Sequence, residues 1–148
     1  MKKFKFRLQT VLELKSKILD EKLVELSKIL SQIKAEEDVL SELEEKQNSL
    51  NLEVLSLVSN SSNINVEQVV NLKNYLPKIE DKIKSQRQLI NDMKNVLELK
   101  QDEVNAAYRD KEILEKLKDK QKKSYYQEFE KVQSNELDDI TICRYSFS

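Results

Sequence analysis

The sequence predicts an all-α fold, a long two-helix antiparallel coiled-coil hairpin whose second helix is longer and overhangs the first. Charged residues make up 36% of the 148 residues and aromatic residues only 6%, so the chain can fill a narrow seam but not a wide globular core. A high content of Glu, Lys and Leu with helical spacing is typical of coiled coils. A single Ser- and Asn-rich stretch separates two long periodic segments, which predicts two helices rather than many.

The first helix is expected over about 6–57. Its apolar residues follow alternating steps of four and three, interrupted at Ser16, which predicts a left-handed seam with another helix. Between Leu26 and Leu43 two steps of three fall together, which predicts a stammer that locally overwinds the supercoil. Glu37 and Gln47 lie at or near the seam and weaken it. The expected seam residues of this helix are Leu12, Leu19, Leu23, Leu26, Leu30, Ile33, Leu40, Leu43, Leu50, Val54 and Leu57.

A turn is expected over about 58–65, where the chain is mostly Ser and Asn. These residues compete with helical hydrogen bonds and favour caps and turns. Asn65 followed three residues later by Gln68 resembles a capping box, so the next helix should begin at about Val66.

The second helix is expected over about 66–138, followed by a C-terminal tail at 139–148. Pro77 removes one helical hydrogen bond at a cost of roughly 3 kcal/mol, which predicts a kink. The alternative is a helix that begins at Pro77, with 66–75 as a separate short helix. We favour the kink because the apolar spacing passes through Pro77 without a shift. Lys100 and Lys111 interrupt a seam formed by Val69, Leu72, Leu76, Ile79, Ile83, Gln86, Ile90, Met93, Leu97, Val104, Ala107, Leu114 and Leu117.

The end of the second helix should lack a partner helix. A turn centred near 61–62 places Met1 opposite Lys122, so later residues overhang. Tyr125, Phe129 and Val132 fall at i, i+4 and i+7, on one face of a helix. Burying one such side chain contributes roughly 1.5–3 kcal/mol, so the stripe predicts a partner surface. The alternative is that the N-terminal segment folds over the overhang. The candidate partner-binding residues here are Phe4, Phe6, Lys122, Lys123, Tyr125, Tyr126, Phe129 and Val132.

The same end is basic. One cluster of Lys and Arg lies within 2–7 and another within 116–123, whereas the middle of the first helix, 36–45, is acidic. A charge run is usually a solvated face, but two basic runs brought together by the fold favour an acidic partner. The formal net charge of −1 argues against a general nucleic-acid binder.

The composition argues against an enzyme. The chain has no His, no Gly and one Cys, so it lacks the usual neutral-pH acid–base side chain and any glycine-rich phosphate loop. Cys143 can form neither an internal disulfide nor a multi-thiolate zinc site, and is interpreted as an incidental thiol. The carboxylates are spread along helical faces rather than paired. We therefore expect no catalytic, cofactor-binding or metal-binding residues, and no cofactor.

No targeting signal is expected. The basic start at 1–7 is not followed by the apolar core of a signal peptide, because charges return at Glu13, Lys15 and Lys17. The longest uncharged run, 54–66, is too short to span a bilayer. A cytoplasmic protein without direct membrane insertion is expected.

Both ends of the sequence resemble one family. The opening run 4–15, FKFRLQTVLELK, and the closing runs 114–118 and 136–140 are similar to the FliJ family of flagellar export proteins. Ala106-Ala107, Arg109, Gln121, Tyr125 or Tyr126 and Arg144-Tyr145 also fit. The segment from Tyr75 to Gln86 resembles the family's segment after the turn. The middle of the chain matches only as generic coiled coil. Asp139 stands where the family often has Glu, and Pro77 departs from the family pattern.

The resemblance implies a role in the flagellar type III export apparatus during bacterial flagellum biogenesis. FliJ proteins are similar to the γ subunit, the central stalk of rotary ATPases. They associate with the flagellar export ATPase ring and with the cytoplasmic domain of the export gate membrane protein, and help to handle export chaperones. This chain would then lie at the flagellar base, peripheral to the membrane. The gate-binding segment would correspond to Tyr75, Ile79 and Ile83, although Ile79 and Ile83 also fit the seam; Tyr75 is expected off the seam.

Two other functions remain open. The chain could be a stalk subunit of a rotary ATPase, but it lacks both the α/β domain of a γ subunit and the length of an archaeal-type stalk. It could instead be a coiled-coil chaperone that clasps exported proteins. An enzyme is the least favoured class, because the residues for catalysis are missing.

Overall fold

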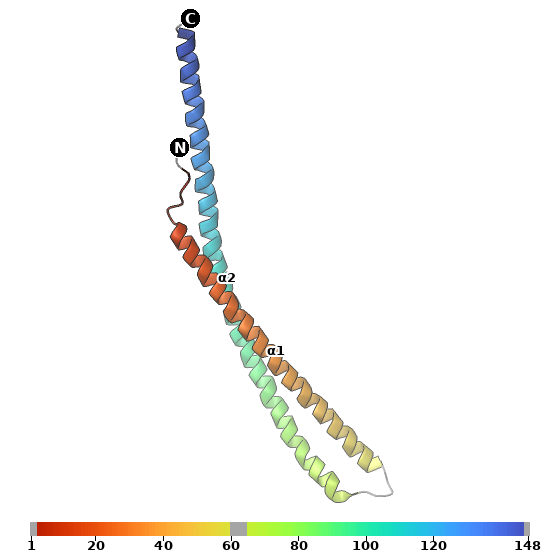
Figure 1. Ribbon diagram of the computed structural model, residues 1–148. Helices are drawn as coiled ribbons and strands as arrows, with labels where there is room; N and C mark the ends of the chain where they lie inside the picture. Colours follow the sequence, from red (N-terminus) through yellow and green to blue (C-terminus); the bar gives the residue numbers. More distant parts are fainter. Residues whose placement is uncertain (1–2, 60–64, 147–148) are drawn as a thin grey trace. The chain divides into compact units, whose positions relative to one another are not determined.

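Two long helices make up the fold. The computed structural model describes residues 3–59 and 65–146, which form α1 (Gln9–Ser59) and α2 (Val66–Ser146) (Figure 1). The described residues contain no strand. The expected all-α hairpin of two helices packed against each other is confirmed. Most of the expected turn, residues 60–64, lies outside the described residues.

The helix starts have defined local hydrogen bonds. Before α1, the Gln9 N–H donates to the Phe6 carbonyl at 3.1 Å, so a turn precedes the first helical residue. Before α2, the Gln68 N–H donates to the side-chain Oδ1 of Asn65 at 3.4 Å. Asn65 is therefore the N-cap that its position in the sequence indicates.

The C-terminal end differs from the sequence-based expectation. α2 continues to Ser146, where the sequence predicts a tail from 139. No Gly or Pro follows Pro77 to end the helix. The Thr141 hydroxyl donates to the Leu137 carbonyl at 2.9 Å, one turn back, so its polar group is satisfied without leaving the helix.

Pro77 lies inside α2, which is continuous from Val66. The alternative in which the helix begins at Pro77 is therefore wrong. Pro77 is exposed. The expected kink stays a prediction.

The chain divides into two compact units, each built from parts of both helices. We call them the terminal unit (Met1–Lys22 with Glu103–Ser148) and the central unit (Leu23–Asp102). Each unit is described by itself.

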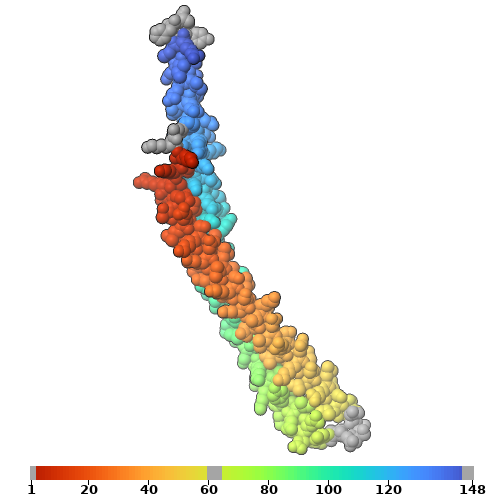
Figure 2. Space-filling view, viewed as in Figure 1, coloured from red at the N-terminus to blue at the C-terminus, as the bar shows by residue number. Residues whose placement is uncertain are grey.

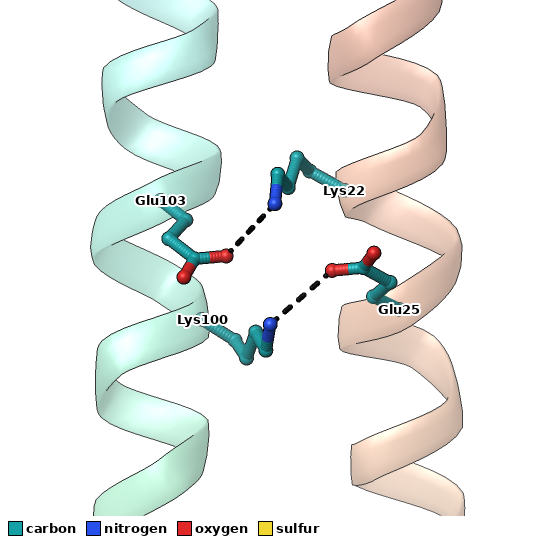
Figure 3. Close-up of polar contacts among 4 residues, drawn as sticks. All are labelled: Lys22, Glu25, Lys100 and Glu103. Atoms are coloured by element: carbon teal, nitrogen blue, oxygen red, sulfur yellow. Dashed lines mark hydrogen bonds and ion pairs between the residues drawn. The ribbon is translucent and has the colours of Figure 1, made fainter.

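In the terminal unit the two helices run antiparallel. The Nζ of Lys15 lies 3.7 Å from Asp110 Oδ2, and the Nζ of Lys22 lies 3.1 Å from Glu103 Oε2 (Figure 3). The partner number falls as the α1 number rises, as an antiparallel pair requires. The buried apolar residues of this unit are Phe6, Leu12, Leu19 and Ala107.

The central unit has the same antiparallel arrangement. The Nζ of Lys100 lies 3.4 Å from Glu25 Oε2 (Figure 3), and the Nζ of Lys94 lies 3.4 Å from Glu37 Oε1. Arg87 pairs with Glu44 at 3.1 Å. These pairs are partly or fully exposed, so each contributes about 0–1 kcal/mol. The stability comes instead from buried Ile33, Ile79, Ile83 and Ile90.

The seam of α1 in the central unit differs from the expected one. Leu23 and Leu30 are 45% and 47% exposed, whereas Ile29 and Glu36 are half-buried. The inward positions therefore step through 26, 29, 33, 36, 40 and 43 in alternating threes and fours, so the expected stammer is wrong. A polar residue occupies the seam at Glu36, whose backbone carbonyl accepts a hydrogen bond from the Gln86 side-chain amide at 2.9 Å. Counting only apolar residues misses such a position.

The seam of α2 follows the expected spacing. Residues 69, 72, 76, 79, 83, 86, 90, 93 and 97 are all buried or half-buried. The two lysines that seemed to interrupt the seam also occupy it, because Lys100 and Lys111 are half-buried. The Lys111 ammonium lies 3.7 Å from Glu115, so its charge is paired along the helix.

Candidate functional site

The N-terminal segment packs against α2 in the terminal unit. Phe6 is buried, with 7% of its surface exposed, and Phe4 is half-buried. The ring centroids of Phe4 and Tyr125 lie 5.7 Å apart and tilted by 50°, and Tyr126 meets Tyr125 edge-on at 5.5 Å. The alternative in which this segment folds over the overhang thus holds as far as Tyr125. Phe6 is a core residue, so we leave it out of the candidate surface.

Beyond Phe129, α2 is bare. Every residue from Glu130 to Arg144 is exposed, and Figure 2 shows this last part of α2, in blue, beyond the red N-terminal segment. Phe129 is half-buried, and Val132 is 54% exposed. A groove runs along this helix face, lined by Tyr125, Glu128, Phe129, Val132, Gln133 and Glu136. We call the segment from Phe129 to Arg144 the bare end.

Charge changes sign along this part of α2. Lys122 and Lys123 are exposed at the base, as the sequence predicts. The bare end itself carries four acidic residues, Glu130, Glu136, Asp138 and Asp139, against two basic ones, Lys131 and Arg144. The basic runs predict an acidic partner, but the acidic residues of the bare end, which the sequence also shows, do not fit that prediction.

The residues expected to contact the export gate separate into two groups. Ile79 and Ile83 are 1% and 4% exposed, so they are core residues of the central unit. A partner could reach them only by opening the hairpin, and we leave them out of the candidate surface. The period of three and four that made them seam candidates explains their burial.

Tyr75 flanks the seam rather than standing apart from it. The Lys46 ammonium donates a hydrogen bond to the Tyr75 hydroxyl at 3.0 Å and lies 5.3 Å from the ring centroid. This hydrogen bond and the positive charge of Lys46 lower the pKa of Tyr75, with smaller contributions from the charges of Lys82 and Lys78. Tyr75 is therefore an accessible aromatic in a positive environment, held by α1.

Among the described residues no group of three or more His, Cys, Asp or Glu side chains could hold a metal ion. No helix of the described chain is both long and apolar enough to cross a bilayer. Cys143 is exposed near the end of α2.

Comparison with known proteins gives a match at the level of the family. No curated protein matches the chain, and no solved structure does. A family model described as "Flagellar FliJ protein" matches residues 4–147, nearly the whole sequence. The match extends from the N-terminal aromatic segment to the bare end of α2. The chain therefore belongs to the FliJ family, a non-enzymatic component of flagellar protein export.

Proposed function

We propose that this chain is a stalk of the flagellar type III export apparatus, in which the terminal unit associates with the export ATPase ring. Membership of the FliJ family supports a role in flagellar export. The observation that carries the finer proposal is the bare end, an uninterrupted exposed helix with Phe129 and Val132 on one face. A ring pore could supply the apolar sleeve that this helix lacks.

The second half of the proposal concerns the export gate. The chain would link the ring to the cytoplasmic domain of the gate membrane protein at the flagellar base, in the cytoplasm, and would regulate the ATPase. Tyr75 is the accessible residue of the gate-binding segment implied by the family resemblance. Binding of export chaperones is an additional proposed activity, without a residue of its own.

The ring proposal is tested by removing the apolar stripe. We expect Phe129→Ala with Val132→Ala to abolish stimulation of the flagellar export ATPase, because the double variant loses the apolar face but no seam contact. Gln127→Ala with Lys131→Ala is the matched control, since both residues are exposed on the other side of the helix. A double variant that melts like the parent and still stimulates the ATPase fully contradicts the proposal.

Charge at the base of the bare end gives a second readout. Reversal of Lys122 and Lys123 to Glu should weaken association with the ring most at low salt, because exposed charges are screened beyond roughly 8–10 Å at ordinary ionic strength. Association can be measured by sedimentation of the purified components over a salt series. An equal loss at all salt concentrations would argue against an electrostatic contact.

The gate proposal is tested at Tyr75. We expect Tyr75→Ala to weaken binding to the gate's cytoplasmic domain, measured by calorimetry. Lys46→Met is the control, because it removes the ammonium that holds Tyr75 while leaving the aromatic side chain in place. Unchanged binding by Tyr75→Ala removes this residue from the site.

A further inference from the structure

One helix face at the end of α2 carries an ordered series of side chains. Starting at Lys118, positions in alternating steps of four and three define what we call the end stripe: Lys118, Lys122, Tyr125, Phe129, Val132, Glu136, Asp139 and Cys143. Steps of four and three keep residues on one face, as in a coiled-coil seam. The stripe is basic at its start, apolar in its middle and acidic towards its end.

The end stripe is complementary to itself when reversed. If Phe129 is set opposite Val132 of a second copy running antiparallel, Lys122 falls opposite Asp139 of that copy. In the same alignment Tyr125 falls opposite Glu136, a pairing of a hydroxyl with a carboxylate. No like charges face each other along the stripe. A parallel alignment would instead place Lys122 against Lys122 and Glu136 against Glu136, which is unfavourable.

Most of the side chains in this pairing are exposed, whereas Tyr125 is half-buried and in ring contact with Phe4. Lys122, Val132, Glu136 and Asp139 are all exposed, and Phe129 is half-buried. Within the part of the N-terminal segment that the structure describes, from residue 3 onward, no residue lines the groove on the stripe's open flank. Phe4 shares a groove with Leu117, Gln121 and Ser124 on one flank of Tyr125, whereas the groove on the other flank is lined by Phe129, Val132, Gln133 and Glu136.

From the order of charges and the exposure of the stripe we propose that the end stripe binds the same segment of a second copy of this chain, forming an antiparallel homodimer. The order of charges favours a second copy as the partner. The stripe runs from basic through apolar to acidic, so an antiparallel copy places acidic residues opposite the basic ones. The antiparallel arrangement is isologous, so each contact occurs twice.

The dimer should be weak and sensitive to salt. From Lys122 to Asp139 the paired helix is about 27 Å long, at roughly 1.5 Å per residue. A two-helix contact of that length is smaller than the interfaces of stable complexes. Its terminal ion pairs are exposed, so salt weakens them.

The dimer goes beyond the proposed function and does not depend on it. The homodimer and the proposed ring contact both use Phe129 and Val132. A second copy and an ATPase ring would therefore compete for the same helix face. Self-pairing would then cover that face while no ring is present. If the homodimer is absent, ring binding is unaffected; if ring binding is absent, the dimer can still be measured.

The test is sedimentation velocity of the full-length protein over a concentration series at low salt. We expect a concentration-dependent dimer, and Lys122→Glu or Asp139→Lys should raise its dissociation constant about tenfold, since two ion pairs become repulsive. The double variant Lys122→Glu/Asp139→Lys should restore association close to that of the parent, because it exchanges the two charges. This recovery separates a specific pairing from a loss of helix stability.

A matched control tests the position of the charge. Lys120→Glu makes the same charge change at an exposed lysine, but residue 120 lies about 200° around the helix from residue 122. It should dimerise like the parent. A monomeric parent at all concentrations, no recovery in the double variant, or an equal effect of Lys120→Glu each overturns the proposal.

The orientation is tested by disulfide formation in a Cys143→Ser background. A mixture of Phe129→Cys chains and Val132→Cys chains should give mainly mixed disulfides, because positions 129 and 132 face each other in the antiparallel pair. Disulfides that instead join position 129 to position 129 in the Phe129→Cys chain alone would indicate a parallel pair and overturn the antiparallel assignment.

Discussion

The apolar positions of α2 have the same spacing in both units, but their burial differs between the units. In the central unit Ile79, Ile83 and Ile90 are buried against α1. In the terminal unit the same period continues through Phe129 and Val132, yet Val132 is 54% exposed. Steps of three and four thus predict which residues share a face of the helix. Whether that face is buried depends on how far α1 and the N-terminal segment extend alongside α2.

The largest expected effect tests this difference in burial. We expect Ile79→Ala to lower the free energy of unfolding by about 2–5 kcal/mol, because it leaves a cavity in a closed seam. Val132→Ala should change it by less than about 0.5 kcal/mol, since an exposed side chain loses little. Urea denaturation followed by circular dichroism measures both. Similar losses would mean that Val132 is packed within the folded monomer.

A smaller effect tests the polar seam position of the central unit. The Gln86 amide donates to the Glu36 carbonyl at 2.9 Å in a partly buried site. We expect Gln86→Ala to cost about 1–2 kcal/mol, because the half-buried hydrogen bonds to the Glu36 carbonyl and carboxylate are both lost. Gln88→Ala is the control on the same helix, where the amide makes only an exposed contact with Asp92 at 3.0 Å. Equal urea midpoints for the two variants would show that Gln86 does not stabilise the seam.

The smallest effect concerns ionisation of Tyr75. Its pKa lies below the usual 10.0 because the Lys46 ammonium hydrogen-bonds to the phenolic oxygen and stabilises the phenolate. Folding therefore favours the ionised form, so the contribution to stability is present above pH 10 and is lost as the pH falls through the lowered pKa.

Ultraviolet titration of the tyrosines measures this shift. The difference between the parent and Tyr75→Phe isolates Tyr75, which should ionise below pH 10, and Lys46→Met should move its ionisation to higher pH. An unaltered Tyr75 titration in Lys46→Met would show that the hydrogen bond does not set the pKa.

Much of the candidate site was visible in the sequence. The spacing of Tyr125, Phe129 and Val132 predicts one helix face, and the excess length of the second helix predicts that this face extends past the first. Asn65 was identified as the cap because a side-chain oxygen at that position can accept a backbone N–H. These features depend on local geometry and on counting residues, which the sequence contains in full.

Other features required the neighbouring helix to be seen. Ile29 rather than Leu30 lies in the seam, and Glu36 occupies a seam position with Gln86 as its partner; no apolar pattern indicates a carboxylate there. Tyr75 seemed to stand off the seam until its contact with Lys46 was known.

The sequence by itself determined that the chain forms two long helices, each with an apolar stripe, because helix periodicity is a local property. Only the tertiary structure decided which polar residues enter the seam between the helices and that α2 continues to Ser146. It also decided that Phe6 is buried and that Phe4 packs against Tyr125, where the sequence predicts both as partner-binding residues. Those outcomes depend on side chains that are distant in sequence. Their pairing is set by the register of one helix against the other, which spacing within a single helix does not specify.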